Sequence, residues 1–142
     1  MIGLASDHAG FELKEFIKSV LDKKEMAYED FGTYSTERVD YPDYAHKLAL
    51  AVRSGNVELG IAVCGTGNGM AITLNRHEGI RAALCWEEEI AQLARAHNDA
   101  NIMVLPGRYI SEAETKLCID AFFEAPFEGG RHQNRIEKIE IL

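Results

Sequence analysis

The chain has 142 residues, of which 46% are hydrophobic and 27% charged, and 23 acidic against 15 basic residues give it a formal net charge of −8 at pH 7. This length predicts a single domain spanning residues 1–142, and the acidic balance disfavours nucleic acid as a partner because it repels a phosphate backbone. No apolar run approaches the roughly 20 residues that cross a bilayer, no signal-peptide pattern is visible, and the three cysteines lack zinc-ligand spacing. We therefore expect a cytoplasmic protein with reduced thiols that binds neither a membrane nor a metal.

Short apolar runs alternate with amphipathic ones through the first half of the chain. Residues 2–6 predict a strand, residues 11–25 a helix with one apolar face, and residues 26–31 a second strand. After a polar stretch, Pro42 is expected to open a helix that runs to about Arg53. The run 57–64 is apolar enough to predict a strand that is buried on both faces.

The second half repeats this alternation. A glycine-rich loop opens a helix that runs to about Arg76, and it is followed by a strand at 80–85, a helix at 87–97 and a strand at 100–106. Residues 111–125 predict a helix that begins with the capping-box pair Ser111 and Glu114, and a last helical segment follows the glycine pair at 129–130. Five strand–helix alternations predict an α/β fold: a three-layer, Rossmann-like sandwich with a five-stranded parallel sheet and an extra C-terminal helix.

Polar residues gather where such a sheet binds ligands, at the carboxyl ends of its strands. The residues that flank these predicted ends are Asp7, His8, Cys64, Gly65, Thr66, Gly67, Asn68, Gly69, His97, Asn98 and Arg108. His8 and His97 are candidates for acid–base work, although a loop histidine is as often incidental. His46 and His77 fall on or beside predicted helices and are expected to be solvated or to cap them.

The glycine-rich loop CGTGNG predicts close approach of the backbone to a ligand. Gly65, Gly67 and Gly69 lack a Cβ, and the helix that follows offers free N–H groups. Such a loop suits a phosphate, a carboxylate or a transient enediolate. It is a poor dinucleotide fingerprint, because it lacks the GxGxxG spacing and follows the third strand instead of the first. A tight turn without any ligand is the remaining alternative.

Cys64 ends the strand before this loop, and two interpretations compete. A cysteine that ends an apolar strand is often inert packing. A thiol beside a helix N-terminus, with the Thr66 hydroxyl two residues on, is expected to have a pKa lowered toward neutrality, and its thiolate could take a proton from carbon. Cys85 and Cys118 lack such surroundings and are predicted to lie in the core.

The C-terminal segment concentrates positive charge in an acidic protein. Arg131 and Arg135 are four residues apart, so on a helix they share one face and form a fork for a phosphate group. The alternative is a solvated face on which they pair with Glu128 or Glu137.

Six motifs, taken together, resemble the ribose-5-phosphate isomerase B family, which also includes galactose-6-phosphate and allose-6-phosphate isomerases. In chain order these motifs are SDHAGFELK, DYPDYA, CGTGNGM, GIRAALC, AHNDANI and EGGRHQNRI. The resemblance extends from residue 6 to about residue 139, and the combination is far more specific than any one motif.

The resemblance implies an aldose–ketose isomerase that needs no metal and no cofactor. It implies that Cys64 moves a proton between C1 and C2 through a cis-enediolate, with help from Thr66, and that His97 opens the furanose ring. The remaining implied roles are oxyanion binding by the 65–69 backbone and Asn98, hydroxyl binding by Asp7, phosphate binding by His8, Arg108, Arg131 and Arg135, and lining of the site by Tyr41. It also implies a site shared between the subunits of a homodimer or homotetramer.

One position distinguishes branches of that family. Some relatives lack the cysteine and carry a glutamate just after the last loop glycine, where this chain has Met70. Because Met70 cannot accept a proton, the resemblance implies a cysteine base. Three alternatives stay open: an isomerase of a six-carbon aldose phosphate, a non-catalytic sugar-phosphate sensor, and a flavodoxin-like nucleotide-binding module.

Overall fold

Five parallel strands form the central sheet of the computed structural model, which describes residues 1–141. The strands are β1 (Ile2–Ser6), β2 (Tyr28–Asp30), β3 (Leu59–Cys64), β4 (Ala82–Leu84) and β5 (Ile102–Pro106). They lie side by side in the order β2-β1-β3-β5-β4. The predicted α/β class and five-stranded parallel sheet are confirmed.

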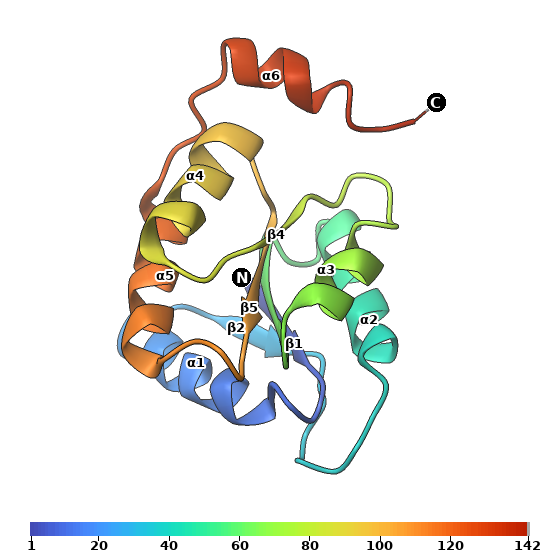
Figure 1. Cartoon of the computed structure of the whole chain (residues 1–142), viewed down its shortest axis with the longest axis vertical. Coiled ribbons are helices and arrows are strands. Elements are labelled where there is room, and N and C mark those ends of the chain that lie inside the picture. The colour runs from blue at the N-terminus through green and yellow to red at the C-terminus, as the bar shows by residue number, and fades with distance from the viewer. Residues whose placement is uncertain (142) are drawn as a thin grey trace.

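Within residues 1–141, six helices accompany the sheet. They are α1 (Phe11–Lys23), α2 (Tyr41–Arg53), α3 (Asn68–Leu74), α4 (Glu88–Asn98), α5 (Glu112–Glu124) and α6 (Arg131–Ile136). Helices α1, α4 and α5 cover one face of the sheet, and α2 and α3 cover the other (Figure 1). A separate apolar core fills each interface, so the predicted three-layer sandwich is confirmed.

Most elements are shorter than the sequence predicts, and the largest differences concern the two edge strands. β2 and β4 have three residues each, where six were predicted. Each edge strand pairs with only one neighbour, β2 with β1 and β4 with β5. Fewer of their residues therefore form sheet hydrogen bonds than the length of the apolar run predicts.

The connections place the topological switch point between β1 and β3. From β1 the chain moves outward to β2 on one side, whereas β3, β5 and β4 extend the sheet on the other. Ligands of doubly wound sheets bind outside the carboxyl ends at such a point. The loop after β1 is held tightly there, because a Cβ added to Gly10 would lie 2.4 Å from the Val63 carbonyl oxygen of β3.

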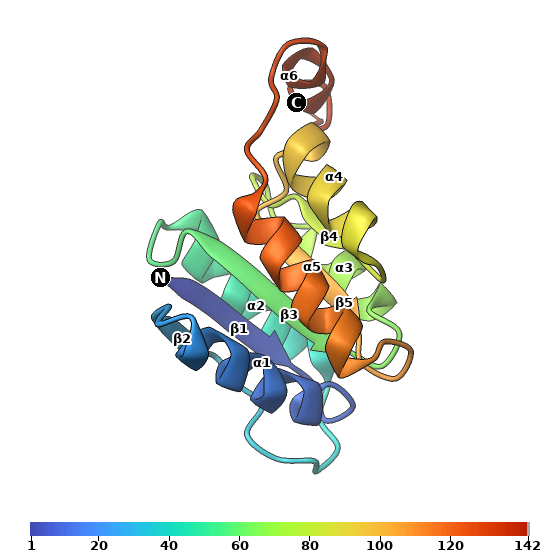
Figure 2. The ribbon, with the colours of Figure 1, turned by 90° about the vertical axis from the view of Figure 1, so that its left-hand side faces the viewer.

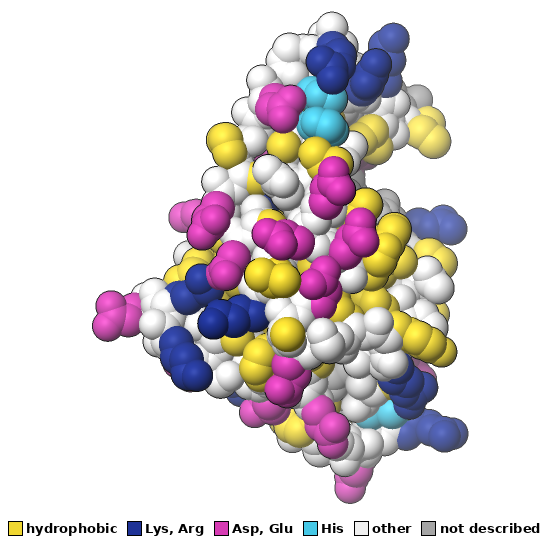
Figure 3. Space-filling view, turned by 60° about the vertical axis from the view of Figure 1, so that its left-hand side comes forward, with side chains coloured by type: hydrophobic (Ala, Val, Ile, Leu, Met, Phe, Trp, Pro, Cys, Tyr) yellow, Lys and Arg dark blue, Asp and Glu magenta, His cyan; other side chains and the backbone are white. Residues whose placement is uncertain are grey.

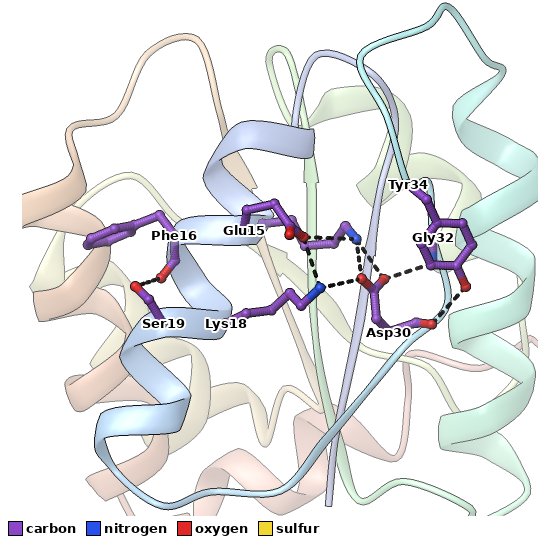
Figure 4. A network of polar contacts seen from close by, with 8 residues as sticks. Glu15, Phe16, Lys18, Ser19, Asp30, Gly32 and Tyr34 are labelled. Atoms are coloured by element: carbon purple, nitrogen blue, oxygen red, sulfur yellow. Dashed lines mark hydrogen bonds and ion pairs between the residues drawn. The ribbon is translucent and has the colours of Figure 1, made fainter.

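A polar network fixes the strand ends next to this point. The ammonium of the buried Lys14 on α1 lies 2.6 and 2.5 Å from the two carboxylate oxygens of Asp30 at the end of β2. Lys18 and the Gly32 N–H donate to the same carboxylate (Figure 4). Gly32 and Thr33 then exchange backbone hydrogen bonds with Ser6, the last residue of β1. The network therefore braces the segment from which Asp7 and His8 project.

Helix α6 lies outside the sandwich, beyond the C-terminal end of α4 (Figure 2). The Glu128 N–H donates to the Ala96 carbonyl oxygen at 2.9 Å, which fastens the preceding segment to the last turns of α4. The predicted extra C-terminal helix is confirmed, and both of its arginines are exposed. Across residues 1–141, every helix falls short of the length and apolarity that a membrane span requires.

Candidate active site

A pocket of about 280 Å³ opens at the carboxyl ends of the central strands. Its lining residues are Asp7, His8, Ala9, Tyr41, Cys64, Gly65, Thr66, Gly69 and Arg108. All of them except Ala9 are predicted site residues, and they come from four separate segments of the chain. The volume lies near the lower end of the roughly 300–1,000 Å³ typical of small-molecule sites, so the pocket suits a compact ligand.

Cys64 lies at the end of β3 with only 4% of its surface exposed. Burial raises the pKa of its thiol, and hydrogen bonds from the backbone of Met70 and Gly67 act in the opposite direction without cancelling the effect of burial. The predicted lowering toward neutrality is therefore wrong for the single chain, because desolvation of the thiolate outweighs the N–H groups at the start of α3.

The other two cysteines are confirmed as core residues. Cys85 and Cys118 are fully buried and free, and burial raises the pKa of each thiol to about 12. Neither is a candidate for proton transfer at neutral pH.

Two glycines of the loop are needed for its packing. Gly67 precedes α3 with φ +81°, and a Cβ there would lie 2.3 Å from Leu84 Cδ1. A Cβ at Gly69 would lie 2.5 Å from the ring of Tyr41, which lines the pocket. The loop is thus wedged between β4 and the start of α2. The packing role of the glycines is thus seen directly, and ligand binding by the loop stays a prediction, supported by the backbone N–H groups of Gly67 and Gly69 beside Cys64.

Asp7 and His8 project from the end of β1. The Asp7 carboxylate accepts the Gly10 N–H at 3.0 Å and is 93% buried (7% exposed). Nδ1 of His8 accepts the Val39 N–H at 3.2 Å, so the neutral imidazole carries its proton on Nε2. His8 can therefore donate a hydrogen bond to an anionic oxygen while it remains uncharged.

Arg108 brings a positive charge to the glycine loop. Its backbone N–H donates to the Gly65 carbonyl oxygen at 3.0 Å, and a Cβ at Gly65 would lie 3.4 Å from its Nη1 atom. The guanidinium is exposed at the pocket, where it can pair with a phosphate or a carboxylate.

Of the remaining predicted site residues, Gly67 and Asn68 belong to the glycine loop without lining the pocket, and the other four do not reach the pocket within one chain. They are His97 and Asn98 at the end of α4, and Arg131 and Arg135 on α6. The chain enters β5 after α4, and Cys64 pairs with Pro106 at the far end of that strand. Four residue steps of about 3.3 Å separate the two ends of β5, or about 13 Å along the strand axis. The structure therefore divides the predicted site into two groups at opposite ends of the sheet (Figure 2).

A larger pocket of about 800 Å³ lies at the α6 end of the molecule. Its lining includes Arg81, Asn98, Ile139 and Glu140, and Asn98 is the predicted site residue among them. Because no cysteine or histidine lines it, we place the candidate active site in the smaller pocket, where Cys64, the glycine loop and Arg108 meet.

Two contacts between histidines are not predicted from the sequence. His46 Nδ1 lies 2.7 Å from His77 Nε2, so these residues form a pair instead of capping helices. The rings of His97 and His132 stack with centroids 4.2 Å apart, and both Nε2 atoms face the carboxylate of Glu128. The spacing of four residues between Glu128 and His132 is a signal for their contact, but nothing local to the sequence brings His97 to them.

The arginines of α6 pair with neither Glu128 nor Glu137. Within residues 1–141, no carboxylate lies within ion-pair distance of Arg131 or Arg135, whereas Glu137 accepts from Gln133 and Glu128 faces the two histidines. Two guanidiniums thus remain available to an external anion.

Comparison with known families agrees with this geometry. The sequence profile of the family described as Ribose/Galactose Isomerase matches residues 2–139. The chain belongs to this family. The isomerase family membership predicted from the six motifs is confirmed over nearly the whole chain.

Individual members of the family are similar along their full length. Ribose-5-phosphate isomerase B of Escherichia coli is 46% identical over 141 residues, which cover 99% of this chain and 95% of that protein. The crystal structure of a ribose 5-phosphate isomerase from Thermotoga maritima has a TM-score of 0.96 and 54% identity, covering 97% of this chain and 95% of that one. The Mycoplasma genitalium ribose-5-phosphate isomerase B, solved with bound ribulose-5-phosphate, has a TM-score of 0.92 and 42% identity, covering 97% and 92%.

Proposed function

We propose that this chain interconverts ribose 5-phosphate and ribulose 5-phosphate. The observation that carries the proposal is the pocket at the ends of β1 and β3, where Cys64 lies beside the glycine loop and Arg108. Family membership and the full-length similarity to the Escherichia coli enzyme support the same reaction. The similarity to an isomerase that binds ribulose-5-phosphate supports the same substrate pair.

Cys64 acts as the base in this proposal. Its thiolate takes the proton from C2 of the open-chain aldose, and the electron pair of that C–H bond moves through the C1 carbonyl to leave a cis-enediolate. The thiol then returns a proton to C1, while the oxygens at C1 and C2 exchange a proton, which yields the ketose. Met70, fully buried beneath the loop, offers no alternative base.

The loop after Cys64 stabilises the negative charge that develops on the enediolate. The backbone N–H groups of Gly67 and Gly69 lie within hydrogen-bonding reach of Cys64, and the wedged packing of these two glycines already orders the loop. Preorganised donors of this kind supply the largest electrostatic contribution in many enzymes. In this proposal Thr66 assists the thiol: it lines the same pocket as Cys64, and its hydroxyl accepts the Asn68 N–H at 3.2 Å.

The phosphate and the hydroxyls of the sugar bind around this centre. Asp7 holds sugar hydroxyls, Tyr41 lines the site, and His8 and Arg108 take the phosphate oxygens. Binding energy from the remote phosphate positions C1 and C2 against the thiolate.

A second copy of the chain completes the site. His97, Asn98, Arg131 and Arg135 lie at the end of the sheet opposite Cys64, and α6 presents its arginines outward. An antiparallel arrangement of two copies would bring one chain's α6 to its partner's pocket. We therefore propose a homodimer, or a homotetramer built from such dimers, in which His97 opens the furanose ring, Asn98 binds the oxyanion and the arginines hold the phosphate.

Mixing two inactive variants tests the shared site. Chains with Cys64→Ala and chains with Arg135→Ala are each expected to be impaired, and exchange of subunits should create some sites in which both groups are intact. Activity above that of both parents supports sharing. Absence of recovery, despite exchange demonstrated by mass spectrometry, would place the base and the arginine fork in one site of one chain.

The reaction itself is tested with a panel of five- and six-carbon aldose phosphates, measuring ketose formation. Ribose 5-phosphate should give the highest kcat/KM, which would place the enzyme in the cytoplasmic pentose phosphate pathway. Preference for galactose 6-phosphate or allose 6-phosphate would identify a six-carbon isomerase. Binding without turnover of any sugar phosphate would identify a sensor and contradict the proposal.

A further inference from the structure

Three potential metal ligands meet where the segment before α6 crosses the end of α4. His97 Nε2 lies 3.7 Å from Glu128 Oε2, and His132 Nε2 lies 3.6 Å from Glu128 Oε1. The three ligand atoms all lie within 4.8 Å of one another. In Figure 3 histidine side chains lie next to an acidic group at the α6 end of the molecule.

His132 supplies an independent reason to expect a ligand. Its side chain is 93% buried (7% exposed), yet its Nε2 atom has no hydrogen-bond partner among residues 1–141. A buried nitrogen without a partner forfeits the hydrogen bond that it makes with water in the unfolded chain. The Glu128 carboxylate lies 3.6 Å from it, a distance that is too long for a hydrogen bond but suits two ligands of one ion.

The donor set and the closeness of the three ligand atoms suit zinc and the ions that resemble it. An ion with tetrahedral bonds of about 2.0–2.1 Å separates its ligand atoms by about 3.3 Å, so each histidine–carboxylate distance needs a contraction of a few tenths of an ångström. The His97 and His132 rings stack only 12° from parallel, so the more exposed His97 ring must also turn before both in-plane lone pairs point at one ion. Glu128 is about half exposed and can supply that contraction, whereas its backbone is fixed by the hydrogen bond to Ala96. Two imidazoles with one carboxylate suit Zn²⁺, Co²⁺, Ni²⁺ or Cu²⁺, and water takes the fourth position.

We propose that His97, Glu128 and His132 form a binding site for a divalent transition-metal ion of the zinc class, and that its occupation inhibits the enzyme. The ion occupies the Nε2 lone pair of His97, which then cannot exchange a proton with the ring oxygen of the sugar. The inhibitory part of this inference rests on the proposed function, whereas the site itself does not. The nearby charges of Arg131 and Arg135 oppose a cation, so the ion binds less tightly than it would at a site without them.

Metal binding is measured in untagged protein by titration with Zn²⁺ and by the visible absorption of Co²⁺. The Cys64→Ser background removes the thiolate as an alternative ligand. We expect one ion per chain and a cobalt spectrum without thiolate-to-metal charge transfer. Loss of a group that only orients a metal ligand lowers metal affinity by about 10–100-fold. Glu128 and His132 are proposed as ligands themselves, so Glu128→Gln and His132→Asn should each weaken Zn²⁺ binding by about tenfold or more. Glu128 is exposed, so Glu128→Gln also serves if His132→Asn does not fold.

His77→Asn is the matched control, because it removes one member of the other histidine pair. Binding that survives Glu128→Gln and His132→Asn, or that is lost in His77→Asn, would overturn the site. In assays of the wild-type chain, Zn²⁺ should slow turnover of cyclic ribose 5-phosphate, and Glu128→Gln should need about tenfold more Zn²⁺ for the same fractional inhibition. Equal inhibition of both proteins would place the inhibitory ion at Cys64 and overturn the regulatory part. A chain that binds the ion but isomerises no sugar phosphate would contradict the proposed function and leave the site standing.

Discussion

The ion pair between Lys14 and Asp30 gives the sharpest prediction about what holds the site in place. The Lys14 side chain is 1% exposed and the Asp30 side chain 13%, so replacement of Lys14 by methionine leaves a nearly buried carboxylate without its main partner. Breaking a buried pair in this way costs about 3–5 kcal/mol. For a domain of this size that corresponds to a fall in Tm of roughly 10–15 °C, at roughly 3 °C per kcal/mol.

Lys18→Met is the matched control for this substitution. Lys18 lies on the same helix one turn later and contacts the same carboxylate at 3.1 Å, but its side chain is 26% exposed. A partly solvated pair contributes about 0–1 kcal/mol, so Lys18→Met should lower Tm by only a few degrees. Replacing both Lys14 and Asp30 with methionine and leucine removes the unpaired charge and should recover much of the loss.

Thermal unfolding followed by circular dichroism measures these differences, and steady-state kinetics detects their effect on the site. Because the Asp30 network holds Gly32 and Thr33 against Ser6, Lys14→Met should also raise KM for the phosphorylated sugar through Asp7 and His8. Equal losses of Tm in Lys14→Met and Lys18→Met would refute the reasoning, since burial would then not govern the cost.

The same pair predicts a dependence of stability on pH. Burial by itself would raise the pKa of the Asp30 carboxyl, but hydrogen bonds from Lys14 and Gly32 hold that pKa below its ordinary value. A carboxyl with a lowered folded-state pKa contributes stability above its unfolded pKa of about 3.9, and this contribution is lost as the pH falls through the folded value. The stability difference between wild type and Asp30→Asn should therefore shrink on acidification below about pH 4; a difference that is constant with pH would contradict it.

Further predictions concern the chemistry and the loop. If His97 acts only in ring opening, His97→Asn should cripple turnover of the cyclic sugar but spare an open-chain substrate; equal damage to both would assign His97 to proton transfer or binding. Arg135→Ala should raise KM for the phosphorylated sugar by about ten- to a hundredfold through loss of a charge-assisted hydrogen bond, and an unchanged KM would remove it from the phosphate site. Because burial raises the pKa of Cys64, the thiolate fraction and kcat should rise with pH from about 6 to about 9, whereas a flat profile would show that the assembled site lowers that pKa. Gly67→Ala should lower the free energy of unfolding by about 2–4 kcal/mol, because it combines a positive φ with a clash, and Gly65→Ala, with its nearest contact at 3.4 Å, should cost much less.

Patterns local to the sequence predict much of this fold and most of the residues that line the candidate pocket. The alternation of apolar runs predicts the five strands and the helices up to α5, and the glycine pair at 129–130 marks the start of α6. The rule for carboxyl ends brings Asp7, Cys64 and Arg108 to one pocket before their distances are known. The Ser111 cap is likewise found as predicted, accepting the Glu114 N–H at 3.0 Å.

What the sequence could not give depends on contacts between distant segments. Lys14 looks like one more charged residue of α1, although it occupies the apolar stripe between Leu13 and Ile17, and only the position of Asp30 explains its burial. The pKa of Cys64 depends on a balance between burial and backbone N–H groups that spacing does not reveal. His97 lies next to a strand in the sequence, but it precedes β5 instead of following it. It therefore lies at the opposite end of the sheet from Cys64.

The most direct test of the proposed reaction compares the wild-type chain with Cys64→Ala on ribose 5-phosphate. Formation of ribulose 5-phosphate is followed by NMR, and binding of the sugar phosphate is measured separately by calorimetry. Wild type should form the ketose, and Cys64→Ala should lose activity by about 10²- to 10⁴-fold or more while it still binds ribose 5-phosphate, because only the general base has been removed. Turnover by Cys64→Ala close to that of wild type, or no ketose formation by the wild-type chain, would contradict the account.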